Sequence, residues 1–208
     1  LAGLFADDVP AIMDGNWEQV LKESKEQWQA ALQANPHDQQ LLADIRQFRN
    51  RAHLAIALSE LLGLVNIQES WEMLTQIAEI ALQGVVSSLL KGRAVEECGW
   101  VIIGLGKLGA GELNYSSDID LIALYDAHAD KTDVPAASEK QAKHFTTMTR
   151  RLSQLLSQQT KDGFGWRVDF RLRPDPAVTP LCLPTDAAVS YYESIARTWE
   201  RAAFIRAR

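Results

Sequence analysis

Hydrophobic residues recur every three or four positions through the first half of the chain, with polar and charged residues between them. This spacing places the apolar side chains on one face of a helix, so it predicts three helices, over about 17–34, 38–62 and 67–91. The apolar faces are interpreted as packing surfaces. The expected helix starts are Asn16 with Gln19, Asp38, and Asn66 with Glu69.

The pattern changes after residue 98 to short apolar runs. Trp100–Ile103 is typical of a buried strand, and a second apolar strand begins at Asp118. Glycines in the connection allow a tight turn and a close approach of the backbone to a ligand. These glycines are Gly104, Gly106, Gly109 and Gly111.

The pattern further along predicts two more helices. A polar loop at 127–137 precedes an apolar stripe that predicts a helix over 138–159, and Asp162–Gly163 then predicts a turn. Prolines between 174 and 184 indicate an irregular, extended link. A last helix is predicted over 185–208, capped by Thr185 or Asp186.

Asp118 and Asp120 are the first candidates for chemistry. Residues two apart on a strand point to the same face, so these carboxylates lie side by side while Ile119 and Leu121 face apolar packing. Adjacent carboxylates repel, which raises one pKa unless a cation lies between them. A divalent cation resolves the conflict, and Mg²⁺ is commonly held by one or two carboxylates together with substrate phosphates.

Ser116, Ser117 and the glycine-rich backbone lie directly before this pair. Their O–H and N–H groups are donors of the kind that bind phosphate. The sequence therefore favours a metal site and a phosphate site within one turn. A plain turn with solvated aspartates is the alternative, but it leaves two acids on an apolar strand unexplained.

A dinucleotide-binding turn is a second alternative. Gly104-Leu-Gly106-Lys-Leu-Gly109 matches the G-x-G-x-x-G fingerprint, with Asp126 as the ribose-binding acid. That motif requires a helix that connects two parallel strands. Residues 107–117 are barely long enough for such a crossover and are interrupted by glycines, so this reading is disfavoured.

Residues 164–174 alternate strictly between apolar and mostly charged residues, which predicts a strand. Its charged face carries Arg167, Asp169, Arg171 and Arg173. These residues form either a surface ion-pair ladder or a third metal carboxylate with phosphate-binding arginines beside it. Asp118 and Asp120 upstream favour the second interpretation. Removing Asp169 from such a cluster need not lower stability and could raise it.

Composition bounds these interpretations. Of the 208 residues, 47% are hydrophobic, which suffices for a sizeable core, and the net charge of −6 argues against a general nucleic-acid binder. Residues 140–173 nevertheless carry eight basic and two acidic residues, so an anionic ligand is plausible there. Arg46, Arg49 and Arg51 are expected on a solvated helix surface.

The two cysteines, Cys98 and Cys182, form neither a disulfide framework nor a metal-ligand spacing. Together with the lack of a signal peptide or a membrane-spanning run, this predicts a cytoplasmic location without a membrane partner. The chain begins without Met and stops within a helical pattern, so it is expected to be a fragment of a longer protein.

Several motifs, in this order, resemble one family. They are Gly-x-Gly-Lys-Leu-Gly, Ser-Ser-Asp-Ile-Asp, Arg-Val-Asp-x-Arg-Leu-Arg-Pro and Trp-Glu-Arg, preceded by Ile45-Arg-Gln-Phe-Arg-Asn-Arg. The chain resembles, over nearly its whole length, the bifunctional glutamine synthetase adenylyltransferase/deadenylylase of bacteria. Ala110, where that family commonly has glycine, is a mild departure.

The resemblance implies an α+β fold of the DNA polymerase β-like nucleotidyltransferase type, a mixed sheet flanked by helices. An all-helical segment at 1–98 would precede a catalytic domain at 99–208. The run Glu112–Ile122 resembles the amino-terminal half of the family protein, which removes AMP from a tyrosine of glutamine synthetase by phosphorolysis and releases ADP. The adenylylating half, which transfers AMP from ATP, is the alternative.

The resemblance also assigns roles to residues. Asp118, Asp120 and Asp169 would be catalytic and would hold two Mg²⁺ ions about 4 Å apart, with Mn²⁺ as a substitute. Gly106, Lys107, Gly109, Ser116 and Ser117 would bind phosphate oxygens, and Arg171 or Arg173 the incoming phosphate. Glu200 and Arg201 would line the substrate site. The implied partners are glutamine synthetase, a PII-type signalling protein, phosphate and ADP or ATP, without nucleic acid.

Overall fold

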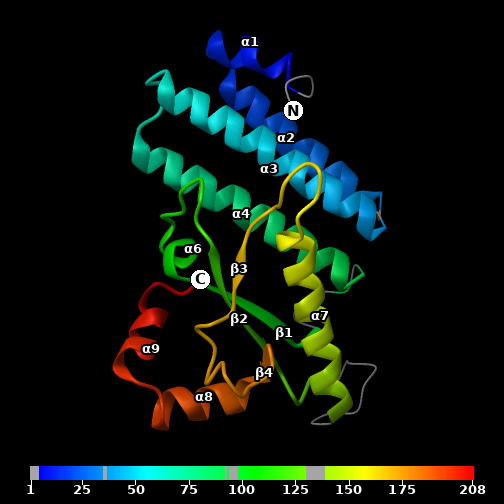
Figure 1. The fold of residues 1–208 in the computed structure, drawn as a ribbon, viewed down its shortest axis with the longest axis vertical. Helices are drawn as coiled ribbons and strands as arrows, with labels where there is room; N and C mark the ends of the chain where they lie inside the picture. Colours follow the sequence, from blue (N-terminus) through cyan, green and yellow to red (C-terminus); the bar gives the residue numbers. More distant parts are fainter. Residues whose placement is uncertain (1–4, 35–36, 92, 94–97, 130–138) are drawn as a thin grey trace. The chain divides into compact units, whose positions relative to one another are not determined.

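The computed structural model describes residues 5–34, 37–91, 93, 98–129 and 139–208. The chain forms two compact units (Figure 1). The helical unit comprises Leu1–Gly84, Gly111–Ser117 and Leu155–Trp166, and the sheet unit comprises Val85–Ala110, Asp118–Gln154 and Arg167–Arg208. The boundary predicted at 92–99 and the loop predicted at 127–137 lie largely outside the described residues.

Long helices dominate the helical unit, as the periodicity predicts. α2 packs against α3 through Trp28 and Phe48, whose rings stack with centroids 5.6 Å apart. Gly84 of α4 lies against Trp28, where a side chain on Gly84 would clash with the indole. The helices are α1 (Asp8–Met13), α2 (Trp17–Gln33), α3 (Asp38–Leu61) and α4 (Ile67–Leu89), the last of which continues into the sheet unit.

The predicted helix starts are partly confirmed. Asn66 and Glu69 form a reciprocal capping box, with Asn66 N–H donating to Glu69 at 2.7 Å and Glu69 N–H donating to Asn66 at 3.0 Å. Asn16 stands at the start of α2, but its side chain makes no capping hydrogen bond. Asp38 is already inside α3, and the cap is His37, whose Nδ1 accepts from the N–H of Gln40.

The expectation of a solvated arginine face on α3 is wrong. Arg46 is fully buried and donates to the carbonyl oxygens of Leu42 and of three residues between 155 and 163. Burial lowers the pKa of Arg46 to about 10. Arg51 is paired with Asp8 and Glu23, at 2.7 and 2.9 Å. These side chains hold segments of the helical unit together and are not free for a ligand.

The sheet unit is built on a mixed sheet that has four strands in the described part of the chain. β1 (Trp100–Leu105) pairs antiparallel with β2 (Ile119–Tyr125). β3 (Val168–Asp169) runs parallel to the start of β2, and β4 (Cys182–Pro184) runs parallel to its end. The predicted α+β class with a mixed sheet is confirmed.

Helices cover both faces of this sheet (Figure 1). On one face, Phe145 of α7 (Glu139–Ser157) stacks on Tyr125 of β2 with centroids 4.9 Å apart. On the other face, Ile122 and Leu124 of β2 form a core with Ala188 of α8 (Thr185–Ser194). The alternation of side chains along a strand separates these two sets, so Asp120 shares the face of Ile122 and Leu124.

The strand predicted over 164–174 is too long, because only Val168–Asp169 pairs with the sheet. Within the helical unit, the N–H groups of Gly165 and Trp166 donate to the carbonyl of Leu156 at 2.9 and 3.1 Å. On the other side, the N–H of Arg171 donates to the side chain of Asp169 and turns the chain. Local hydrogen bonds thus replace sheet pairing at both ends.

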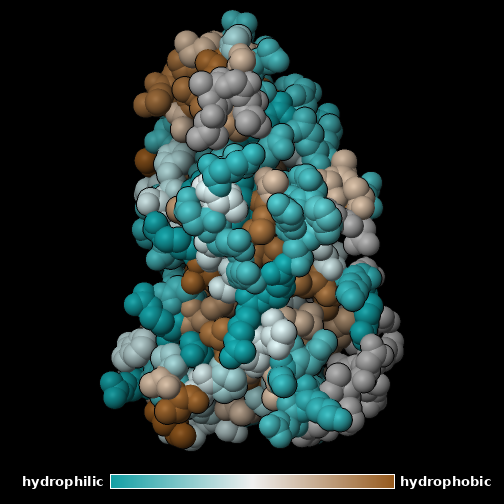
Figure 2. Space-filling view, turned by 45° about the vertical axis from the view of Figure 1, so that its right-hand side comes forward, coloured by the Kyte–Doolittle hydropathy of each residue, from teal (hydrophilic) through white to brown (hydrophobic). Residues whose placement is uncertain are grey.

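The last helix is also divided, contrary to the prediction. α8 is followed by α9 (Thr198–Ala202) and a 3₁₀ turn, η1 (Ala203–Arg206). Pro184, and neither Thr185 nor Asp186, holds the N-cap position of α8. The link before it contains β4. The sequence predicted an irregular link there because of its prolines. None of the helices formed by the described residues is long and apolar enough to cross a membrane, and hydrophilic residues predominate on the face shown in Figure 2.

Candidate active site

The glycine-rich connection joins antiparallel strands through a short helix, α6 (Gly106–Ala110). A dinucleotide-binding turn requires parallel strands around its helix, so that alternative is excluded by the β1–β2 pairing. Gly106 begins α6 with φ +55°. A β-carbon on Gly106 would clash with the carboxylate of Asp120. The glycine therefore allows the start of α6 to lie directly against this aspartate.

Asp120 and Asp169 are register partners on the parallel strands β2 and β3. In-register residues on neighbouring strands point to the same face, so the two carboxylates share one face of the sheet. Asp118 precedes β2 by one residue and is exposed. The sheet thus brings together the three acids that the sequence singles out.

Two of the acids are engaged by arginines. Asp118 accepts a hydrogen bond from Nε of Arg167 at 2.5 Å. Asp169 accepts from Arg171 through the main-chain N–H at 2.8 Å and through Nε at 2.7 Å. Arg167 is not among the predicted site residues. The signal that could have found it is its place on the charged face of the alternating segment, two residues before Asp169.

The pKa values reflect this crowding. The pKa of Asp120 is raised, first by partial burial and then by the negative charges of Asp169 and Asp118. The pKa of Asp169 is lowered, mainly by the hydrogen bond from the Arg171 side chain. Asp120 is therefore the least compensated charge of the three, and a cation beside it would relieve the repulsion.

As they stand, no group of three or more His, Cys, Asp and Glu side chains in the described residues is arranged to hold a metal ion. Asp118 and Asp169 are each hydrogen-bonded to a guanidinium instead. The donor set still suits Mg²⁺, since it offers only carboxylate oxygens on adjacent strands.

Arg173 and Gly109 have structural partners. The Arg173 guanidinium donates to the carbonyl oxygens of four residues between 170 and 180 and holds this loop together. A β-carbon on Gly109 would clash with the carbonyl of Arg206. These contacts account for both residues without a ligand. Arg171, by contrast, is exposed and lies beside the acids.

Glu200 and Arg201 lie on α9. Glu200 is buried and accepts from the hydroxyl of Tyr191 and from the N–H of Arg197, both at 2.7 Å. It thereby caps α9. Arg201 is exposed and donates to the carbonyl of Glu193. Lys107 is exposed on α6. A role for these three residues in substrate binding remains a prediction.

Ser116 and Ser117 belong to the helical unit, although Asp118 follows them directly in the chain. The side chain of Asn114 organises their turn: its Oδ1 accepts from the N–H of Ser116 at 3.1 Å and from Oγ of Ser117 at 2.9 Å. Phosphate binding by these serines remains a prediction.

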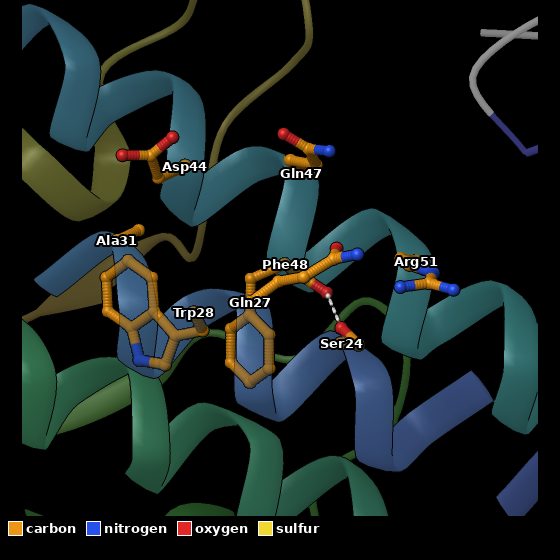
Figure 3. Close-up of a pocket in the computed structure, with 8 residues that line it drawn as sticks. All are labelled: Ser24, Gln27, Trp28, Ala31, Asp44, Gln47, Phe48 and Arg51. Carbon is orange, nitrogen blue, oxygen red and sulfur yellow. Dashed lines mark hydrogen bonds between the residues drawn. The ribbon is translucent and has the colours of Figure 1, made fainter. Parts of the chain in front are cut away.

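The helical unit also contains a crevice of about 170 Å³ between α2 and α3. Figure 3 shows its aromatic wall of Trp28 and Phe48, and Ser24 bonded to the carbonyl of Phe48. Arg51 at its edge is engaged with Asp8 and Glu23. The crevice contains none of the residues predicted to bind substrate.

Comparison with known proteins gives a consistent result. Residues 10–208 match the family model described as "Glutamate-ammonia ligase adenylyltransferase". Proteins named bifunctional glutamine synthetase adenylyltransferase/adenylyl-removing enzyme are similar to the chain. The one from Brucella suis is 39% identical over 84% of this chain and 19% of its own length, that from Bartonella henselae 42% over 83% and 19%, and that from Rhizobium meliloti 36% over 100% and 22%.

The chain thus spans about a fifth of the length of these relatives. The family match, in contrast, covers nearly all of the chain, including the three aspartates and the arginines beside them. On this evidence the chain belongs to the glutamate-ammonia ligase adenylyltransferase family.

Proposed function

We propose that the sheet unit carries a nucleotidyltransferase site that removes AMP from adenylylated glutamine synthetase by phosphorolysis. The observation that carries this proposal is the register pairing of Asp120 with Asp169, with Asp118 close by in sequence. Three acids around the start of one strand, one of them with a raised pKa, suit divalent-metal chemistry on phosphate esters. The family match supports the substrate class.

The reaction transfers an adenylyl group between two oxygens. An oxygen of inorganic phosphate forms a bond to the α-phosphorus of the AMP–tyrosine ester, and the bond from that phosphorus to the tyrosine oxygen breaks. The products are ADP and the unmodified tyrosine, which gains a proton. Little covalent chemistry is required of the protein, so positioning and electrostatics determine the rate.

Asp118, Asp120 and Asp169 would hold Mg²⁺. For this, Asp118 would have to leave its hydrogen bond with Arg167, and Asp169 its hydrogen bond with Arg171. Bound Mg²⁺ would neutralise charge on the attacking and leaving oxygens. Arg171, released from Asp169, is placed to bind the incoming phosphate through its guanidinium. Arg167, released from Asp118, offers a second cation on the same side of β3.

The resemblance of Glu112–Ile122 to the amino-terminal half of the family protein supports removal of AMP over its addition. The adenylylating reaction uses the same bond exchange with ATP as the AMP donor and is the second candidate. The relatives' names include both activities. A PII-type protein is proposed as a regulatory partner on the family resemblance alone.

The test is to incubate the chain with adenylylated glutamine synthetase, Mg²⁺ and phosphate, and to measure ADP release. A parallel reaction contains unmodified glutamine synthetase and Mg²⁺-ATP, and AMP incorporation is measured. The Asp120→Asn variant is the control for both. We expect ADP release that the variant lacks. AMP incorporation without ADP release would support the second candidate, and equal ADP release by the variant would contradict the proposed site.

A further inference from the structure

Within the sheet unit, the segment 198–208, which contains α9 and η1, lies against the turn between β1 and α6 (Figure 1). Two hydrogen bonds join it to Gly104 of β1: the N–H of Gly104 donates to the carbonyl of Arg208 at 2.8 Å, and the N–H of Arg208 donates back at 2.9 Å. The carbonyl of Arg206 lies so close to Gly109 of α6 that a β-carbon there would clash with it. The segment therefore contacts both the strand before the turn and the helix after it.

This turn holds Asp120 from two sides. Leu105, the last residue of β1, is fully buried and is the register partner of Asp120 on β2. Gly106 follows it and lies directly against the carboxylate of Asp120. A shift of the segment 198–208 would therefore act on the backbone that surrounds Asp120.

Glu200 ties the segment to α8. Its buried carboxylate accepts from the hydroxyl of Tyr191 on α8 and from the N–H of Arg197, both at 2.7 Å. The hydrogen bond from Arg197, followed by that from Tyr191, lowers the pKa of Glu200, so the carboxylate is charged at neutral pH and accepts from both. Since α8 packs on the sheet through Ala188, Glu200 connects the segment to the same sheet that carries the aspartates.

We propose that Glu200 and Tyr191 are positioning residues for the nucleotidyl-transfer site, because they seat the segment 198–208 on the turn that holds Asp120. All of these residues belong to the sheet unit. Misplacement by about 1 Å can cost about 100-fold in rate. This inference rests on the proposed function for its effect on rate, but not for the seating of the segment.

The test compares three variants of the chain. Tyr191→Phe removes only a hydroxyl, and Glu200→Ala removes both acceptor oxygens. Thr185→Val is the matched control, because it removes a hydroxyl of α8 that donates to the carbonyl of Tyr125 at 3.1 Å. This contact joins the same helix to the same sheet, but at the opposite end of β2 from Asp120.

Amide hydrogen exchange, which needs no turnover, tests the seating. The N–H of Gly104 is the reporter, because it donates to Arg208. In Tyr191→Phe its exchange is expected to rise about tenfold, the factor for loss of one hydrogen bond to a charged group, whereas Thr185→Val leaves it unchanged. Unchanged exchange in Tyr191→Phe, or an equal rise in Thr185→Val, would overturn the seating.

Isothermal titration with Mg²⁺ in the presence of ADP tests the placement of Asp120, again without turnover. Groups that orient a metal ligand typically contribute 10- to 100-fold in affinity. We expect about tenfold weaker Mg²⁺ binding in Tyr191→Phe and wild-type affinity in Thr185→Val. Wild-type affinity in both Tyr191→Phe and Glu200→Ala would overturn the positioning role.

Steady-state kinetics of ADP release separate positioning from direct contact with substrate. Tyr191→Phe and Glu200→Ala are both expected to lower kcat about tenfold or more with KM for phosphate unchanged. A raised KM in Glu200→Ala, with wild-type kinetics in Tyr191→Phe, would instead make Glu200 a substrate ligand and overturn the positioning role. A wild-type chain without ADP release contradicts the proposed function, and the exchange of Gly104 then still decides whether Glu200 and Tyr191 seat the segment.

Discussion

The carboxylate of Asp120 occupies the space that a β-carbon on Gly106 would take, well inside the 3.0 Å that real contacts keep. Gly106 also has φ +55°, a left-handed conformation that favours glycine. Two independent constraints therefore require glycine at the start of α6, and one of them acts directly on the candidate active site.

Gly106→Ala is expected to displace Asp120, to lower the rate of ADP release at least about tenfold and to destabilise the chain by about 1–3 kcal/mol. Gly111→Ala is the matched control, because Gly111 has φ +77° but no atom within 4 Å of a β-carbon. Gly111→Ala therefore introduces backbone strain without a steric clash, whereas Gly106→Ala introduces both. Equal rates in the two variants would show that contact with Asp120 is irrelevant to turnover.

Asp120→Asn is expected to abolish turnover and to raise the melting temperature of the metal-free chain, because it removes the least compensated charge without creating a cavity. Isothermal titration with Mg²⁺ in the presence of nucleotide checks the metal site. Asp186→Asn is the control, because it changes an exposed aspartate that lies 3.4 Å from the imidazole of His128. Equal Mg²⁺ affinity in wild type and Asp120→Asn would remove Asp120 from the site.

The stability gain in Asp120→Asn should depend on pH. Because the folded pKa of Asp120 lies above the ordinary value of 3.8, wild-type stability falls as pH rises from 3.8 through the folded pKa. The gain should be full above the folded pKa and absent below pH 3.8. Melting curves of both proteins across this range test the sign, and a gain that grows toward low pH would contradict it.

Asp169→Ala is expected to lose orders of magnitude in rate, since the stabilisation of transition-state charge by a metal is worth several kcal/mol. The contact with Arg171 favours a fall in its stability, an outcome that the sequence alone left open. Arg171 lowers the pKa of Asp169, so the charged form stabilises the fold above pH 3.8 and that contribution is lost as pH falls through the folded pKa. The rate and the melting temperature without metal are measured together, and a near-wild-type rate would contradict the three-carboxylate site.

Arg171→Ala and Arg173→Ala are expected to affect different properties of the protein, the first mainly phosphate binding and the second mainly stability. Arg173 donates to four carbonyl oxygens, so its loss should destabilise the chain by about 1–3 kcal/mol and leave KM for phosphate unchanged in the folded fraction. Arg171→Ala should raise KM for phosphate and lower the melting temperature less than Arg173→Ala does, because its guanidinium is exposed and bonds only the Asp169 carboxylate among the contacts described above. A raised KM for phosphate in Arg173→Ala, with an unchanged KM in Arg171→Ala, would identify Arg173 as the phosphate ligand.

The bound nucleotide is expected to be an adenine mononucleotide. β1 and β2 are antiparallel, so the glycine-rich segment lacks the strand arrangement that binds a dinucleotide. Thermal shifts with ADP, AMP or ATP plus Mg²⁺ should exceed the shift with NAD⁺. Tight binding of NAD⁺ without metal would contradict this.

The pattern of neighbouring residues in the sequence predicts those elements that are stabilised by contacts between residues close in sequence. The helices follow apolar spacing, and the Asn66–Glu69 capping box follows from two residues three apart. The partners of Arg46 lie up to 117 residues away in sequence, and nothing in its neighbourhood signals that it is buried. The alternation over 164–174 correctly buries Trp166 and Phe170, but hydrogen bonds to Leu156 replace strand pairing at its start.

The candidate site shows the same limit. Asp118 and Asp120 are identified by their spacing at the start of an apolar run, although β2 begins only at Ile119. Asp169 is identified by its place on an alternating segment, and each argument uses only neighbours in sequence. The role of Glu200 as a cap that also accepts from Tyr191 depends on a break between α8 and α9 that the residue pattern does not reveal. The predicted domains, 1–98 and 99–208, remain a prediction.

The interleaving of the two units has a consequence for how the chain folds. The path passes from one unit to the other after residues 84, 110, 117, 154 and 166. During synthesis, Arg46 cannot reach its acceptor on Gly163 until the 117 residues that follow it, up to that glycine, have been made, so the helical unit is completed late. Long-range closures of this kind slow folding. No single truncation separates the units, and expression of residues 1–84 alone should give helices without the segments that bury their polar groups.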